Sequence, residues 1–214
     1  MGSRGSGSGR SGVGKHGAGM TGGRGEGGNP QNAEYLTNQI GKAGGTQFAD
    51  EVMSTRDDLE NTYGEGVKNV TLMTADMKEG TLGCYMPATN TVYMNNKYVN
   101  NPELTNAMKK AAKSGFHPSI GTYTGAEAVA AHELGHGMAD YIEKTKGVNA
   151  KAIVTSAAST LGIKPENMAG FISGYARTNY HETIAEACAD VYCNGSKATK
   201  QSKAIMNAVQ SYMS

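Results

Sequence analysis

Apolar positions recur every three or four residues in the two segments that follow Pro30, residues 32–44 and 46–64, and each segment ends at a glycine. This spacing places the apolar side chains on one face of an α-helix. Residues 67–77 and 80–96 instead contain short β-branched and aromatic runs, and the turn-forming letters PATN divide the second segment. We therefore predict two helices followed by a small antiparallel sheet of about three strands.

The second half of the chain contains helices with clear start and stop signals. Residues 101–115 begin with an asparagine and a proline, which suit an N-cap and the first helical position, and they end at a glycine. Thr124 and Glu127 form a capping box at the start of a helix that ends at Gly147. Further helices are predicted over residues 149–162, from Asn179 to Gly195, and over the C-terminal stretch that contains Ile205 and Val209. The pattern as a whole indicates an α+β fold.

The first 30 residues differ in composition from the rest of the chain. Of the first 28 residues, 13 are glycine, and almost none carries an apolar side chain. Such a segment cannot bury enough apolar surface to offset the entropy that it would lose on ordering. We predict that residues 1–30 form a disordered arm and that residues 31–214 form one domain. Because the arm is basic, any contact with nucleic acid is expected to be confined to it.

Charge and cysteine content exclude several classes of protein. The chain has 20 Lys and Arg against 19 Asp and Glu, so no net charge attracts it to nucleic acid or to an anionic membrane. It has no run of about 18 apolar residues and no signal-peptide core, so we expect no membrane partner. Cys84, Cys188 and Cys193 form no CxxC pair, which disfavours a disulfide framework and a thiolate zinc site. We expect Cys188 and Cys193 to pack as small apolar residues in a reducing compartment.

The stretch Ala128–Ile142 contains the letters HELGH. His132 and His136 are four residues apart, so on a helix they lie on one face and can present two imidazole nitrogens to one ion. Two neutral imidazoles suit Zn²⁺. Glu133 lies about 100° around the helix from His132. That offset makes it a poor third ligand but leaves it near enough to take a proton from a water activated by zinc.

A catalytic zinc ion has three protein ligands and keeps its fourth position for water. The candidates for the third ligand are Glu182, Glu186 and Asp190, which recur every four residues on one face of a predicted helix. An acidic stripe of this kind also occurs on solvated helix faces. Two carboxylates at this spacing can act together, one as a ligand and the other by orienting a ligand histidine. Spacing alone does not choose between Glu182 with Glu186 and Glu186 with Asp190.

The remaining histidines are assigned no chemical role. His117 precedes a proline in a turn and is expected to be structural or solvated. His181 neighbours Glu182, but adjacent residues on a helix point in different directions, so we expect an exposed side chain. His16 belongs to the glycine-rich arm.

These motifs together resemble a known family. HELGH, followed about 40 residues later by residues 173–190, is similar to the zincin metallopeptidases of the anthrax lethal factor type and to related zinc metallopeptidases of phages and prophages. The second motif of that family runs roughly S-x-Y-[AG]-R-T-N-x-x-E-x-x-A-E. The chain matches it at Tyr175, Ala176, Arg177, Thr178, Asn179, Glu182, Ala185 and Glu186. The likeness is strongest over residues 120–195.

The resemblance implies a zincin-like domain and a role for each matching residue. His132, His136 and Glu182 would be the zinc ligands, and Glu133 would be the catalytic base. Tyr175 would donate a hydrogen bond to the oxyanion that forms during hydrolysis. Glu186 would orient one of the ligand histidines from behind.

The resemblance also covers the substrate side and shows where this chain departs from the family. The letters YMPATNTVYMN resemble the edge strand that lines the substrate cleft in zincins and can pair with an extended peptide. Thr183, Ile184 and Cys188 stand where the family usually has bulkier residues. The departures concern the packing of this helix more than the ligands.

The function expected from the sequence is that of a zinc-dependent metalloendopeptidase with a protein or peptide substrate. Its expected location is the cytoplasm of a bacterial host or a virion. One alternative is a structural phage protein with a non-catalytic zinc site, although such a site would normally have four protein ligands and the chain offers three convincing ones. The other alternative is an exported toxin effector of the lethal-factor type, which the missing signal peptide disfavours.

Overall fold

A computed structural model describes residues 31–36 and 47–214, and the predicted arm lies outside this part of the chain. The described strands are β1 (Gln31–Tyr35), β2 (Thr71–Asp76), β3 (Gly83–Met86) and β4 (Thr91–Asn95). The main helices are α2 (Gln47–Tyr63), α3 (Glu65–Lys68), α4 (Glu103–Lys113), α5 (Gly125–Lys146), α6 (Ala150–Leu161), α7 (Pro165–Met168), α8 (Tyr180–Asn194) and α9 (Lys200–Met213). Short 3₁₀ turns join them, namely η1 (Asn96–Tyr98), η2 (Ala169–Phe171), η3 (Tyr175–Arg177) and η4 (Gly195–Lys197). The fold is α+β, as the sequence predicted.

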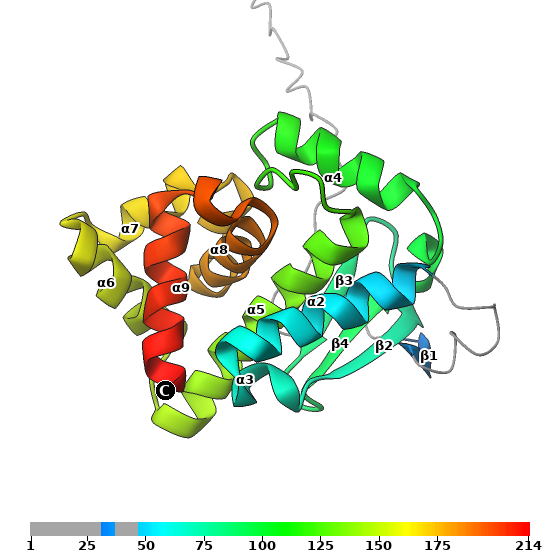
Figure 1. Cartoon of the computed structure of the whole chain (residues 1–214), viewed down its shortest axis with the longest axis horizontal. Helices are drawn as coiled ribbons and strands as arrows, with labels where there is room; N and C mark the ends of the chain where they lie inside the picture. Colours follow the sequence, from blue (N-terminus) through cyan, green and yellow to red (C-terminus); the bar gives the residue numbers. More distant parts are fainter. Residues whose placement is uncertain (1–30, 37–46) are drawn as a thin grey trace, which may run out of the picture.

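Helix α5 runs through the middle of the described molecule (Figure 1). The sheet and α2 lie on one side of it, and α6, α7, α8 and α9 lie on the other. Because α5 is covered on both sides, almost all of its residues from Gly125 to Asp140 are buried. Buried apolar side chains from both sides form one continuous cluster around it. Polar residues on this helix are therefore held in the interior.

The sheet has the strand order β1-β2-β4-β3 and is mixed. β3 and β4 form the hairpin that the PATN turn predicted, but β3 takes the outer edge, so β4 lies parallel to β2. The prediction of an antiparallel sheet is therefore wrong for the β2–β4 pair. Alternation of apolar and polar residues indicates which side of a strand faces the core, but it does not specify the neighbouring strand.

The predicted helix over residues 32–44 is wrong at its start. Residues Gln31–Tyr35 form β1, which pairs antiparallel with β2. Backbone pairing at an open sheet edge satisfies N–H and C=O groups, and this tertiary requirement overrides weak helical periodicity. Residues 37–44 of the prediction lie outside the described chain.

The capping signals of the two central helices are confirmed. The backbone N–H of Thr124 donates to the Glu127 carboxylate at 2.6 Å, the Thr124 hydroxyl accepts from the Glu127 backbone, and α5 ends at Gly147 with φ 67°. In α8 the side chain of Asn179 accepts from the backbone N–H of Glu182 at 2.9 Å. These caps set where each helix begins and therefore which side chains face the neighbouring helix.

Helices α5 and α8 approach each other closely because small residues face each other. A Cβ atom on Gly135 would lie 2.8 Å from the Cα atom of Ala185 and 2.9 Å from the Cβ atom of Cys188. The small residue at position 188, a departure from the family pattern, thus suits this close contact. Cys188 and Cys193 pack as buried apolar residues, as predicted, and all three cysteines are free thiols.

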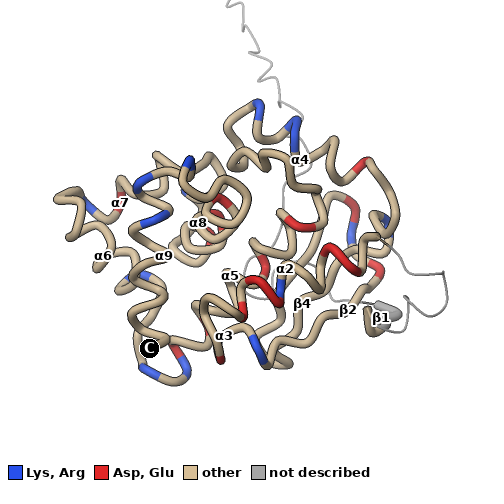
Figure 2. The backbone as a smooth tube through the Cα atoms, viewed as in Figure 1, with Lys and Arg blue, Asp and Glu red and all other residues tan. Residues whose placement is uncertain are grey.

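Charged residues are distributed over many elements of the described chain. Figure 2 shows mostly acidic positions along α2 and basic positions near the end of α4. Among the described helices none is both long and apolar enough to cross a membrane.

Candidate metal centre

The HELGH segment places three buried polar side chains on α5. His132 and Glu133 are 0% exposed and His136 is 2% exposed. One ligand atom from each of these three residues lies within 4.8 Å of the others, so the group could hold a metal ion. Several of their neighbours on the helix are small, namely Ala128, Ala131, Gly135 and Gly137, and these leave room for the polar groups where α5 meets the sheet and α8.

Glu182 reaches this group from the first turn of α8. Its Oε2 atom lies 3.2 Å from Nε2 of His132 and 3.4 Å from Nε2 of His136. The Asn179 cap begins α8 three residues earlier and directs the Glu182 side chain towards α5. The carboxylate of one helix and the two imidazoles of the other therefore face a common point.

The chemistry of these atoms fits a bound cation. Each of the three atoms is buried and, apart from the other two, has no hydrogen-bond partner within the described chain. Such atoms cost free energy unless a proton or a metal ion lies between them. Tetrahedral zinc with ligand bonds of about 2.0–2.1 Å separates its ligand atoms by about 3.3–3.4 Å. The observed separations of 3.2 and 3.4 Å match this value.

When no metal ion is bound, the charges of the neighbouring buried groups shift the pKa values of His132 and Glu182. Burial lowers the pKa of His132, but the Glu182 and Glu186 carboxylates outweigh burial and raise the pKa well above its usual value. Burial likewise opposes ionisation of Glu182, and the two histidine rings lower its pKa to about 2. The buried carboxylates thus favour a positive charge beside the ligand atoms.

Glu186 lies one turn after Glu182 and contacts Nδ1 of His132, the ring nitrogen that does not face Glu182. Its Oε1 atom accepts a hydrogen bond from Nδ1 of His132 at 2.8 Å. Burial opposes ionisation, but hydrogen bonds from His117 and His132 lower the pKa of Glu186 to about 2. The carboxylate is therefore anionic and can orient the imidazole ring.

Asp190 serves a different purpose at the other end of the acidic stripe. Its two carboxylate oxygens accept hydrogen bonds from the Asn194 side chain and from the Thr199 backbone, each at 2.9 Å. It therefore holds the turn between α8 and α9. Of the two pairs that the spacing left open, the structure brings Glu182 and Glu186 to the histidines.

Glu133 lies beside the two histidines and next to strand β3 of the sheet. Both of its carboxylate oxygens are buried. A Cβ atom on Gly83 of strand β3 would lie 3.2 Å from Cγ of Glu133. Burial raises the pKa of Glu133 above its usual range, although His132 and His136 oppose the increase. A carboxylate in this state accepts a proton readily.

Tyr175 lies in η3, just before α8, with its hydroxyl 3.5 Å from Oε1 of Glu182. Its ring centroid is 6.0 Å from that of His132. The phenol is therefore next to the candidate centre, on the side of Glu182.

His117 and Ser173 belong to the centre, and the sequence did not indicate this. His117 is 2% exposed, so the solvated alternative is wrong, and its Nδ1 atom lies 3.1 Å from both oxygens of Glu186. The Ser173 hydroxyl donates to Glu186 at 2.6 Å. His117 is 69 residues from Glu186 in sequence, and no local pattern could reveal this contact. His181 is half-buried, whereas we expected an exposed side chain.

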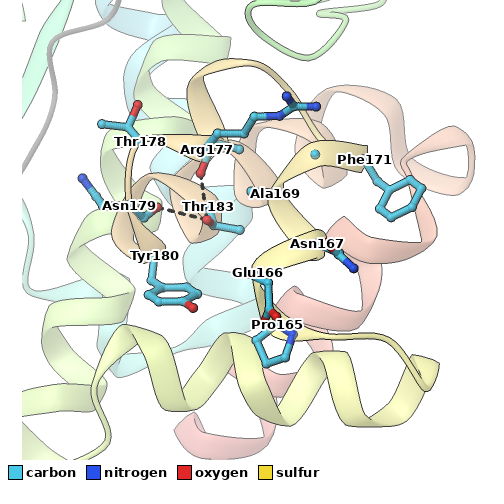
Figure 3. A pocket seen from close by; sticks show the side chains of 12 residues that line it. Pro165, Glu166, Asn167, Ala169, Phe171, Arg177, Thr178, Asn179, Tyr180 and Thr183 are labelled. Carbon is cyan, nitrogen blue, oxygen red and sulfur yellow. Dashed lines mark hydrogen bonds between the residues drawn. The ribbon is translucent and has the colours of Figure 1, made fainter.

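A cavity of about 790 Å³ lies beside the start of α8 (Figure 3). The Thr183 hydroxyl in its wall donates to the carbonyls of Ala176 and Asn179 at 2.8 and 3.0 Å. The cavity is separate from the candidate centre, because His132, Glu133 and His136 do not line it. The lining residues are Pro165, Glu166, Asn167, Ala169, Gly170, Phe171, Ala176, Arg177, Thr178, Asn179, Tyr180 and Thr183.

Comparison with protein-family models, curated proteins and solved structures finds no match to this chain. The geometry of the site and the resemblance of its motifs are therefore the two grounds on which a function can be assigned to this chain.

Proposed function

We propose that this chain is a zinc-dependent metalloendopeptidase with a zincin-like domain. One observation carries the proposal: three buried atoms, Nε2 of His132, Nε2 of His136 and Oε2 of Glu182, face one point and, apart from one another, have no hydrogen-bond partner in the described part of the chain. Two imidazoles and one carboxylate are a ligand set of catalytic zinc sites, which leave one position open. The motif resemblance to lethal-factor-type and phage-encoded metallopeptidases supports the same assignment.

In this proposal each residue has a distinct task. Zinc, when bound, would act as a Lewis acid that activates water and polarises the peptide carbonyl. Glu133 accepts the proton of the attacking water and later passes it to the leaving amine. Tyr175 donates a hydrogen bond from its phenol to the oxyanion that develops on the substrate. Glu186 holds the ring of His132 in place.

The position of β3 supports a peptide as the substrate. β3 is at the edge of the described sheet, and its Gly83 lies next to Glu133. An extended peptide can pair with such an edge through its backbone, which would bring a scissile bond beside the base. The resemblance to phage-encoded enzymes makes a bacterial cytoplasm or a virion the proposed place of action.

The test combines metal analysis with peptide cleavage. We expect one zinc ion per chain by elemental analysis and cleavage of a mixed peptide library by the loaded protein. Glu133→Gln should retain zinc and lose activity by about 10²–10⁴-fold, because only the general base is removed. Glu182→Ala should lose zinc. The exposed Glu79→Gln is a matched control that should behave like the wild type.

Two results would contradict the proposal in different ways. Zinc bound to the wild type without cleavage of any library peptide would favour a structural zinc protein. Normal zinc binding by Glu182→Ala would show that the third ligand is assigned incorrectly.

A further inference from the structure

Three hydrogen-bond donors from three separate segments converge on Glu186. His132 of α5 donates to Oε1 at 2.8 Å, and the Ser173 hydroxyl donates to Oε2 at 2.6 Å. His117, in the connection between α4 and α5, lies 3.1 Å from both oxygens. Glu186 is 0% exposed, and the other two residues outside α5 are also buried. We call His117, Ser173 and Glu186 the Glu186 clamp.

The Glu186 clamp determines which nitrogen of His132 carries the hydrogen. An ionised carboxylate only accepts hydrogen bonds, so Nδ1 of His132 must be the donor. Nε2 of a neutral His132 then presents its lone pair to the shared point with Glu182. If Glu186 rotated away, this ring would lose the contact that defines both its orientation and its tautomer.

The same clamp is connected to the segment that contains Tyr175. The backbone N–H of Gly174 donates to the Gly115 carbonyl at 2.8 Å, and that of Tyr175 donates to the Phe116 carbonyl at 3.0 Å. The Ser173 hydroxyl also accepts from the Ala176 backbone at 3.0 Å. The two backbone bonds thus join the residues just before His117 to the residues just after Ser173.

Ring contacts complete this connection. The ring of His117 packs against Tyr175 at a centroid distance of 5.3 Å and an angle of 67°. Phe116 contacts the same tyrosine at 5.4 Å. The segment between α4 and α5 therefore packs against Tyr175 and also contacts Glu186, the hydrogen-bond partner of the candidate ligand His132.

We propose that His117 and Ser173 are positioning residues of the metal centre, which hold Glu186 so that His132 directs Nε2 at the metal and which fix the Tyr175 segment beside it. This inference depends on the proposed function, because it assigns a purpose to groups around the same centre. Neither residue touches the substrate or the reacting atoms in this proposal. Their effect passes through Glu186 and the backbone of the Tyr175 segment.

The experiment compares zinc affinity with the stability of the metal-free protein. His117→Leu and Ser173→Ala should each weaken zinc binding by about 10–100-fold, measured by competition with a chromophoric chelator. His117→Asn keeps an N–H group near the position of Nδ1 and should recover most of the affinity. Ser202→Ala removes another fully buried serine hydroxyl, which lies 2.7 Å from the Thr199 hydroxyl at the start of α9. This control should lower the urea midpoint without changing zinc affinity.

The outcomes separate this inference from the proposed function. If the wild type binds zinc and cleaves peptides, but folded His117→Leu and Ser173→Ala bind zinc within twofold of it, the inference is wrong and the proposed function stands. If His117→Leu does not fold, Ser173→Ala decides, because it removes one hydroxyl group. If the wild type binds no zinc, both the proposed function and the inference are wrong.

Discussion

Burial and charge act in opposite directions on the pKa of Glu133. Its carboxyl group is fully buried, and burial raises its pKa, while two imidazoles on the same helix act in the opposite direction. A general base works best when its pKa is close to the working pH. The position of Glu133, between β3 and the two histidines, therefore shifts its pKa in the direction that its proposed task requires.

Tyr175 allows a test of a single functional group. Tyr175→Phe removes only the hydroxyl, which lies 3.5 Å from Oε1 of Glu182. We expect kcat to fall by about 10²–10³-fold with little change in KM, because the hydrogen bond is needed mainly by the developing oxyanion. Steady-state kinetics on a cleaved peptide would measure this. An equal loss of zinc affinity would instead show that the phenol acts by holding Glu182.

At the scale of elements, the centre depends on the distance between α5 and α8. His132 and His136 come from one helix, and Glu182 comes from the other, so a small separation of the helices would move the ligand atoms apart. The contact between Gly135 and Ala185 sets this separation. The glycine inside the HELGH motif thus serves packing in this chain.

Gly135→Ala and Gly137→Ala form a matched pair that tests this packing. Gly135→Ala would place a Cβ atom 2.8 Å from backbone of α8, whereas the Cβ atom of Gly137→Ala would lie 3.4 Å from the nearest side-chain atoms. We expect the first change to destabilise the protein by about 1–3 kcal/mol and to weaken zinc binding. The second should be neutral or stabilising by up to about 1 kcal/mol, because alanine favours helix. Urea unfolding and zinc titration of both variants would measure this, and equal results would contradict the explanation.

At the scale of the whole molecule, α5 lies between the sheet and a group of helices (Figure 1). A metal ion bound by both α5 and α8 would link this central helix to the helical side. Ligands that bind only the folded state stabilise it in proportion to the logarithm of their concentration. A bound metal ion should therefore raise the free energy of unfolding of the protein.

Zinc should raise the melting temperature of the metal-free protein. At about 100 times its Kd, zinc would add about 2.7 kcal/mol, which corresponds to roughly 5–10 °C for a chain of this size. Mg²⁺ should cause no comparable shift, because it prefers oxygen ligands in octahedral geometry. Calorimetry of the wild type and of His136→Ala, with chelator and with each metal, would measure the effect. A shift of equal size in His136→Ala would place the stabilising zinc elsewhere.

Local sequence patterns were sufficient to predict the two central helices and the faces that they present. The caps at Thr124 and Asn179 and the four-residue spacing of His132 with His136 are local features, because helix geometry relates residues within one or two turns. The same spacing placed Glu182 on one face with the other carboxylates of α8. These features predicted a metal site with two histidine ligands and a third ligand among the carboxylates of α8, and the motif resemblance selected Glu182.

How these elements meet depends on contacts between distant segments of the folded chain. The assignment of Asp190 to a turn, the contacts of His117 and Ser173 with Glu186 and the parallel pairing of β2 with β4 all join segments that are separate along the chain. Such contacts arise when buried polar groups and open strand edges find partners, and many distant residues could satisfy that need. The spacing of residues along the chain therefore does not predict which distant residue becomes the partner.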